Sequence, residues 1–395
     1  MIKKTIWTAL LGLSLTTQAL TLDEALAKAL EQSPALRAAR AEAQAANEGV
    51  GLSTLWQNPE LEVEAEGLGG DNNGTDVAEY SAMISQKFPM FGKSGKRRAV
   101  AQKVFEASEY AVLEAQLELA VQVRAAFAEA LAQQEIAVIR DQQEKLAREF
   151  FEVAEKRHEE GGASELEVVQ AELTLEEVLM EKQCCFGDLD AAKKLLASLM
   201  GVSVDEVGVP EGNFYDLEGL EDVQIDDAHP TLQRLRAQEE MTRAEATVAR
   251  SRAVPDFSIG AGVKYEAADE AQSFVVAASI PLPFWNRGGA EGAAVLLRAD
   301  AVSAYREQAQ RDLQQQLDRT VQAYRSAGAE AVQYRTRILP KAEQAYALSR
   351  KGYDAGRYSW MELLSAQQNL AGTRIRTVEA VLAARKALAE LSKFQ

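Results

Sequence analysis

The chain has 395 residues and a formal charge of −17, with 60 acidic and 43 basic side chains. A negative charge of this size argues against a nucleic-acid surface, which needs a basic patch. Nine prolines and no Gly/Ser-rich stretch leave no obvious linker, so we expect one elongated body rather than several domains.

The first 19 residues have the three parts of a secretory signal peptide. Lys3 and Lys4 precede an apolar run over residues 6–15, and Thr17-Gln18-Ala19 supplies small residues at a cleavage site. We therefore predict a signal peptide over residues 1–19. Beyond it no apolar stretch approaches the roughly 18 residues of a membrane-spanning helix. The exported protein is then either soluble or spans a membrane as strands.

Short motifs recur at a nearly constant offset along the chain. Ser33-Pro34-Ala35-Leu36 returns 196 residues later as His229-Pro230-Thr231-Leu232, and Gly161-Gly162-Ala163-Ser164 returns 195 residues later as Gly356-Arg357-Tyr358-Ser359. This spacing predicts an internal tandem duplication of one large unit. The first repeat covers residues 20–200, an equatorial linker covers 201–226, and the second repeat covers 227–395.

Each repeat contains one very long helix and two shorter ones. In the first repeat, apolar residues at helical spacing predict a helix over 94–160, followed after a Gly turn by a helix over 163–200. The second repeat has the counterparts 289–352, which Pro340 should bend, and 358–394. Shorter helices over 34–56 and 230–252 precede the strands. The two shorter helices together match the long one in length, which predicts antiparallel coiled-coil packing.

Four segments of about ten residues alternate between apolar and polar side chains. They predict β-hairpins over 59–88 and 256–282, and their length and period are typical of outer-membrane barrel strands. Four strands cannot close a barrel, and an open edge cannot face lipid, so three copies completing a 12-stranded barrel are expected. Glu62, Glu64 and Glu66 either line the lumen or are simply the wet face of a strand; both interpretations explain the alternation.

These residues together resemble the outer-membrane efflux proteins, of which TolC is the best-known member, and especially the outer-membrane components of heavy-metal cation and copper/silver efflux systems. Besides the doubled motifs, the resemblance rests on Phe88-Pro89-Met90-Phe91-Gly92, Ile280-Pro281-Leu282-Pro283-Phe284-Trp285, Ile338-Leu339-Pro340-Lys341-Ala342-Glu343 and Tyr353-Asp354-Ala355-Gly356. It implies a mainly α fold with a small β-barrel contribution: a trimeric channel with a long antiparallel coiled-coil α-barrel.

The resemblance also implies a function. The chain would be the exit duct of a tripartite RND-type efflux pump in the outer membrane of a Gram-negative bacterium, extending into the periplasm. A periplasmic adaptor (membrane fusion protein) and an inner-membrane RND transporter would load it, with heavy-metal cations as cargo and no cofactor. A duct for drugs or type I secreted polypeptides, and a soluble periplasmic scaffold or adaptor, are the alternatives. No nucleophile with a base and no phosphate loop is found, so we expect no enzyme activity.

In the family, the helical hairpin tips are where adaptors dock and where the tube closes. The matching residues of this chain are Arg157, Gly161 and Ser164 in the first tip and Tyr353, Gly356 and Ser359 in the second. Gly352 replaces the basic residue of the second tip. Those residues could equally have local roles, since an Arg at a helix end commonly caps carbonyls.

Two positions complete the gate that the resemblance implies. Tyr353 and Glu362 are the expected pore residues, and Ser365 stands where a second acidic residue would be, so a single carboxylate ring and a weaker constriction are expected. Glu362 could also be one more solvated glutamate.

The remaining chemistry-bearing residues give weak signals. His158 and His229 lack a partner at metal-binding spacing, so no metal site is expected. Cys184 and Cys185 are expected to be packed thiols. Trp56 and Trp285 flank strand ends, as either an interfacial aromatic belt or ordinary packing.

Overall fold

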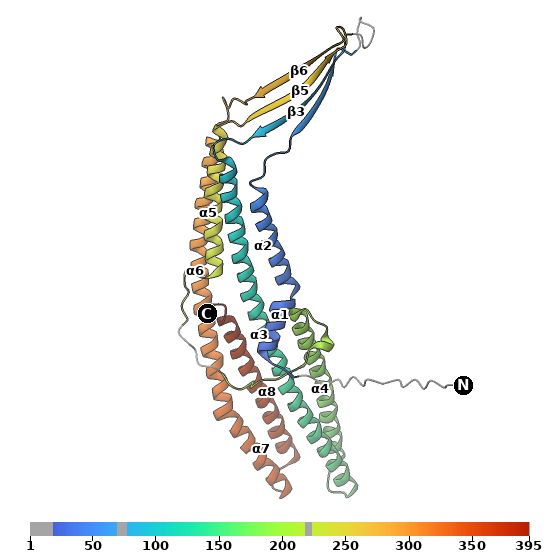
Figure 1. Ribbon diagram of the computed structural model, residues 1–395. Coiled ribbons are helices and arrows are strands. Elements are labelled where there is room, and N and C mark those ends of the chain that lie inside the picture. Colours follow the sequence, from blue (N-terminus) through green and yellow to red (C-terminus); the bar gives the residue numbers. More distant parts are fainter. Residues whose placement is uncertain (1–18, 69–76, 218–222, 395) are drawn as a thin grey trace, which may run out of the picture. The chain divides into compact units, whose positions relative to one another are not determined.

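The computed structural model describes residues 19–68, 77–217 and 223–394 (Figure 1). The predicted signal peptide, apart from Ala19, lies outside these residues, as do 69–76 of the first hairpin and 218–222 of the linker. The chain forms two compact units: the tip unit (Met1–Leu36, Gln116–Gln224 and Gln315–Gln395) and the sheet unit (Arg37–Ala115 and Ile225–Gln314). Each unit takes segments from both predicted repeats, so the repeats of the sequence are not the compact units of the structure.

The sheet unit contains a four-stranded antiparallel sheet in the order β2-β3-β5-β6. Its strands are β2 (Glu60–Glu66), β3 (Glu79–Phe88), β5 (Phe257–Glu266) and β6 (Ala271–Ser279). The β3–β5 pair joins the two hairpins. Leu61 lies opposite Ile84, Ile84 opposite Ala261, and Ala261 opposite Val276. Because directly opposed residues share a face of the sheet, the apolar positions of all four strands gather on one face.

Two helices and the first parts of two longer ones accompany the sheet. They are α2 (Pro34–Leu52), α5 (Pro230–Arg250) and the adjoining parts of α3 (Lys93–Glu159) and α6 (Gly289–Gln333). Ion pairs join α3 to α5: Arg234 Nε lies 2.7 Å from Glu114 Oε2, and Lys103 Nζ lies 2.6 Å from Glu240 Oε2. Ion pairs therefore add specific contacts to the apolar packing of α5.

The tip unit consists of two helical hairpins and a short leading helix. Its elements are α1 (Leu22–Gln32), α4 (Glu165–Met200), α7 (Leu339–Asp354), α8 (Trp360–Leu391) and the remaining parts of α3 and α6. A buried cluster, Phe150, Ala154, Ala171, Trp360 and Leu363, takes side chains from α3, α4 and α8. Within the described residues, no helix is both long and apolar enough to cross a lipid bilayer.

The long helix of the second repeat is interrupted before its proline. The α6 helix ends at Gln333, a π-helical turn covers Tyr334–Ile338, and α7 begins at Leu339. Pro340 lacks an N–H and its ring crowds the preceding turn, so the wider π turn takes up the misfit on its N-terminal side. The sequence predicts a bend here, and the structure shows a change of helix type.

The predicted linker is held to the tip unit by arginines. It contains a 3₁₀ turn, Val204–Glu206, and the two-residue strand β4 (Val209–Pro210), which pairs in parallel with β1 (Ala19–Leu20). Arg385 Nε donates to Phe214 O at 2.7 Å, and its Nη2 donates to Asp216 O at 2.9 Å. Arg335, within the π turn, donates to Tyr215 O. The linker is thus fixed to α8 and to the irregular turn.

Candidate gate and docking site at the hairpin tips

The first hairpin tip reverses the chain through a glycine turn. Gly161 N–H donates to His158 O at 2.9 Å, and Gly162 N–H donates to Arg157 O at 2.7 Å. Gly161 has a φ of 74°, the left-handed conformation that glycine adopts at little cost. The turn therefore depends on the glycine that the sequence pattern singled out.

The second tip repeats these hydrogen bonds 195 residues later. Gly356 N–H donates to Tyr353 O at 2.9 Å, Arg357 N–H donates to Gly352 O at 2.8 Å, and Gly356 has a φ of 67°. The same backbone geometry thus recurs at the offset at which the sequence motifs recur.

A capping box begins the second helix of each hairpin. Ser164 and Ser359 are the N-cap residues, and Glu167 and Glu362 three positions later bond back to them. In the second tip, Glu362 Oε2 accepts from Ser359 N–H at 2.7 Å and from Ser359 Oγ at 2.9 Å. These bonds, the backbone N–H first, lower the pKa of Glu362. The predicted gate carboxylate thus has a local capping role as well.

The two turns carry their large side chain at different positions. In the second tip the Tyr358 ring lies so close to Gly352 that any Cβ at position 352 would collide with it. The corresponding positions of the first tip are Arg157 and Ala163, where a large side chain precedes a small one. The missing basic residue at position 352 therefore has a steric reason: the neighbouring aromatic ring occupies its place.

The first tip is bonded to the second within one chain. Arg157 Nη1 donates to Tyr353 Oη, its Nη2 donates to Gly162 O at 3.2 Å, and its guanidinium carbon lies 5.4 Å from the centre of the Tyr353 ring. Arg157 is half-buried by these contacts. The structure thus brings together two predicted site residues, the basic tip residue and the pore tyrosine, which we call the tip clasp.

An aromatic cluster underlies the tip clasp. Trp360 is 4% exposed, and its ring lies edge-on to Phe150 at 5.1 Å and to Tyr353 at 5.9 Å between centroids. Arg350 lies over the Phe150 ring and bonds to Glu149 at 2.7 Å. The Trp360 ring of this cluster thus packs against Tyr353 and holds it in position for the tip clasp.

The face of α7 and α8 that carries Glu362 is hollowed. A groove of about 580 Å³ is lined by Tyr358, Met361, Glu362, Ser365 and further residues of both helices. Glu362 and Ser365, the two positions expected for the acidic rings, both lie in it. Tyr358 and Met361 are exposed.

The predicted lumen-lining glutamates lie far along the sequence from the tips, on the polar face of the sheet. Glu62, Glu64 and Glu66 alternate with the apolar positions of β2, and every residue of that strand is exposed. Lys264 lies on the same face, 2.5 Å from Glu79 Oε2 and 3.4 Å from Glu266 Oε1. The register places Lys87 of β3 on this face as well. The face therefore combines carboxylates with two lysines, and the second interpretation, a simple wet face, stays open.

The other residues singled out by the sequence have ordinary surroundings. His158 Nδ1 lies 3.0 Å from Ala163 O, and His229 caps α5 through Thr231 N–H. Burial raises the pKa of Cys185, as expected for a packed thiol. Cys184 is exposed, so the prediction of a packed thiol is wrong for that residue, because adjacent helical positions point to different sides of the helix. Among the described residues, no group of three or more His, Cys, Asp or Glu side chains is placed to hold a metal ion.

Sequence reasoning missed three features of these sites. The capping boxes were readable, because Ser and Glu stand three apart at the start of both helices. The tip clasp and the Lys264–Glu79 bridge had no local signal, since their partners come from different helices or strands.

Comparison with known proteins gives the same picture. Residues 25–202 and 224–394 match the family described as outer membrane efflux protein. The cobalt-zinc-cadmium resistance protein CzcC of Cupriavidus metallidurans is 23% identical over 362 residues, which cover 90% of this chain and 85% of that protein. The nickel and cobalt resistance protein CnrC of the same organism is 26% identical over 292 residues, covering 73% and 70%.

Solved structures share the fold. CusC superposes with a TM-score of 0.76 at 18% identity, covering 94% of this chain and 90% of that one. The open state of the MtrE outer membrane channel of Neisseria gonorrhoeae superposes with a TM-score of 0.76 at 17% identity, covering 94% and 88%. The predicted fold, mainly helical with a small β contribution, is confirmed.

Proposed function

Because the chain belongs to the outer membrane efflux protein family, we propose that it is the outer-membrane exit duct of a tripartite RND-type pump that exports heavy-metal cations. In this proposal the chain performs no catalytic step. An inner-membrane RND transporter supplies the energy, and a periplasmic adaptor connects it to the duct.

The single observation that carries the proposal is the sheet. Its apolar face is exposed over all four strands, with Phe274 91% exposed, while glutamates occupy the opposite face. Among the described strands, β2 and β6 each have one neighbour, and such open edges cannot face lipid. Three copies, each adding four strands, would close a 12-stranded barrel with the apolar face outward. We therefore propose a homotrimer in the outer membrane.

Metal cations are the cargo favoured by two observations. The relatives CzcC and CnrC are named as cobalt, zinc, cadmium or nickel resistance proteins. The polar face of the sheet carries Glu62, Glu64 and Glu66, and carboxylates facing a lumen attract cations. A duct for drugs or secreted polypeptides would have the same architecture, so the cargo has to be identified from a resistance phenotype.

Resistance measurements test the cargo. A strain lacking the gene is expected to become sensitive to cobalt, zinc, cadmium, nickel, copper or silver, and not to detergents and dyes. Sensitivity to organic compounds alone would reject the metal assignment. A protein that fractionates with soluble periplasmic proteins would instead support the scaffold alternative.

We also propose that the hairpin tips hold the gate and the adaptor contacts. Tyr353 and Glu362 would form the constriction, and Arg157, Gly161, Ser164, Gly356 and Ser359 would shape the docking surface. The tip clasp supports this assignment, because it ties the first tip to the pore tyrosine. Breaking it with Tyr353→Phe is expected to raise the open fraction of single channels.

Glu362→Ala is expected to change conductance or cation preference in planar bilayers. Glu167→Ala is the matched control, because it removes the same capping contact from the first tip without touching the proposed gate. Glu362→Gln separates charge from capping, since the amide oxygen still accepts the bond from Ser359. Equal behaviour of Glu362→Ala and Glu167→Ala would reject the gate role.

A further inference from the structure

The region where the strands meet the helices is positively charged, whereas the chain as a whole is negatively charged. Residues 87–105, 250–256 and 280–298, here called the junction, hold ten basic and two acidic side chains, although the whole chain carries −17. The basic ones are Lys87, Lys93, Lys96, Arg97, Arg98, Lys103, Arg250, Arg252, Arg287 and Arg298. All lie in the sheet unit. This concentration of positive charge favours an anionic partner at one level of the molecule.

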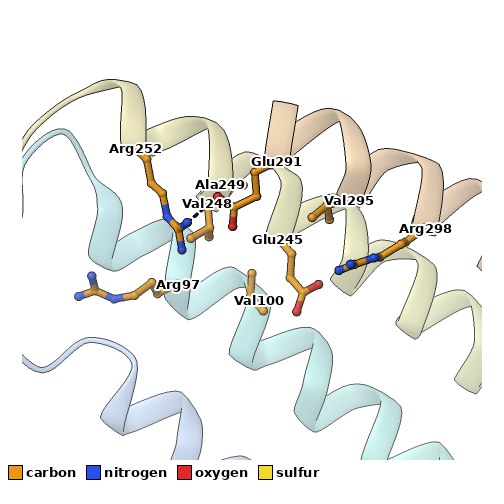
Figure 2. Close-up of a pocket in the computed structure, with 9 residues that line it drawn as sticks. All are labelled: Arg97, Val100, Glu245, Val248, Ala249, Arg252, Glu291, Val295 and Arg298. Carbon is orange, nitrogen blue, oxygen red and sulfur yellow. Dashed lines mark hydrogen bonds and ion pairs between the residues drawn. The ribbon is translucent and has the colours of Figure 1, made fainter. Parts of the chain in front are cut away.

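A pocket opens at the edge of the junction between α3, α5 and α6, and the preceding turns of α5 complete its lining (Figure 2). Its volume is about 370 Å³, and its lining residues are Arg97, Val100, Glu245, Val248, Ala249, Arg252, Glu291, Val295 and Arg298. Ala249 and Val295 are buried, whereas the side chains of Glu245, Arg252 and Arg298 are exposed. An apolar base with charged residues around it suits an amphipathic ligand.

Some charges of this junction pocket are already neutralised and others are not. Arg252 Nη1 lies 2.5 Å from Glu291 Oε2, which neutralises both charges. Arg97 donates to Ser53 O and Ser94 Oγ, so its donors are engaged although its charge has no counter-ion among the described residues. Within the described part of the chain, Arg298 and Glu245 have no hydrogen bond or ion pair. Figure 2 shows their charged ends directed into the same part of the pocket. Arg298 and Glu245 are thus one cation and one anion of the pocket that have neither an ion pair nor a hydrogen bond among the described residues.

Aromatic rings mark the same level of the sheet unit. Trp56, Phe91, Phe284 and Trp285 are all exposed, and Trp285 reaches 95%. Trp and Tyr rings commonly lie at the boundary between lipid and water. This step rests on the proposed function: if the sheet spans the membrane, the junction lies at the level of the phospholipid headgroups.

We propose that the junction pocket binds the headgroup of an aminophospholipid. Arg298, with the free donors of Arg252, would bind the phosphate, since guanidinium and phosphate form charge-assisted hydrogen bonds. Glu245 would accept hydrogen bonds from the primary ammonium. A headgroup with both charges fits the unpaired pair better than a purely anionic one.

The test measures thermal stabilisation of the purified full-length protein in detergent. Short-chain phosphatidylethanolamine, phosphatidylglycerol and phosphatidylcholine are added separately, and inorganic phosphate is a further arm. Phosphatidylethanolamine is expected to raise Tm at the lowest concentration. Arg298→Gln and Glu245→Gln should each weaken its apparent affinity about tenfold, the effect of losing one hydrogen bond to a charged group.

Arg325→Gln is the matched control. Arg325 is also exposed on α6 and has no hydrogen bond or ion pair with the described residues, but it lies outside the junction. Because neither Arg298 nor Glu245 has a partner to lose, their variants should fold normally, which circular dichroism checks. Arg325→Gln should respond to lipid as the unchanged protein does.

Four results would overturn the proposal: equal stabilisation by phosphatidylglycerol or phosphatidylcholine, equal stabilisation by inorganic phosphate, an unchanged response of Arg298→Gln or Glu245→Gln, or no response to any lipid. Conductance in planar bilayers distinguishes failure of the headgroup proposal from failure of the proposed duct function. A protein that conducts normally but shows no lipid preference contradicts only the headgroup site, whereas a protein that forms no pore contradicts the duct itself.

Discussion

The first hairpin tip, residues 157–167, and the second, residues 352–362, share one backbone and differ in their side chains. Both turn on a left-handed glycine and continue into a capping box. In the first tip a large side chain, Arg157, precedes a small one, Ala163. In the second tip Gly352 precedes Tyr358, so the large side chain stands at the later of the two positions. The two tips thus share a backbone conformation, but the first presents a cation and the second an aromatic ring.

The largest expected difference between the tips is at their first helical residue. Trp360 is buried against Phe150 and Tyr353, whereas its counterpart Glu165 is exposed. Trp360→Ala should destabilise the second tip by about 3–5 kcal/mol, as deletion of a buried aromatic side chain does. Glu165→Ala should stay within about 0.5 kcal/mol. Hydrogen exchange of the tip peptides measures both, and equal effects would contradict the asymmetry.

Trp360→Phe sharpens this result. The Trp360 indole N–H is buried and has no hydrogen-bond partner among the described residues. A phenyl ring removes that group and retains most of the aromatic contact. The variant should therefore be far more stable than Trp360→Ala.

A basic residue at position 352 of the second tip should have the next largest effect on the stability of that tip. Gly352→Arg forces a side chain into the Tyr358 ring, and overpacking of this kind costs about 1–3 kcal/mol. The double variant Gly352→Arg/Tyr358→Ala recreates the side chains of the first tip and should recover most of the loss. Protease sensitivity of the second turn measures both variants. No recovery in the double variant would show that the two positions are not coupled.

The two capping boxes should respond alike. Ser164→Ala and Ser359→Ala each remove an N-cap hydroxyl, which costs about 0.5–2 kcal/mol. Hydrogen exchange at the first turn of α4 and of α8 should accelerate to a similar extent. A clearly larger effect in one tip would mean that the caps have diverged along with the side chains.

The smallest expected effect is a pH dependence of the second tip. Hydrogen bonds from Ser359 lower the pKa of Glu362 below its ordinary value of 4.5. A carboxylate with a lowered folded-state pKa stabilises the cap above the unfolded pKa and loses that contribution as the pH falls through the folded one. Exchange protection at the Glu362 amide, corrected for the intrinsic rate, should therefore decline below about pH 4.5. Glu362→Gln should lack this decline.

Periodicity made the elements of the fold predictable. Alternation at Leu61, Val63 and Ala65 indicated a strand, and that strand is β2. The Gly161 and Gly356 turns were equally clear, since only a left-handed residue reverses the helix there. Contacts between distant segments were not predictable: Arg157 meets Tyr353, and Lys264 meets Glu79, across separate elements. The π turn before Pro340 also escaped prediction, because a proline signals a distortion without specifying its form.

The interleaving of the two repeats bears on how the chain is made. Each compact unit needs segments from both halves, and β3 of the first half pairs with β5 of the second. A chain that is synthesised from its N-terminus therefore has no complete unit to fold until its second half has followed. A half-length ancestor would have had to associate with a second copy of itself to obtain the missing strands and helices. Gene fusion would then have replaced association between two molecules with a covalent connection within one chain.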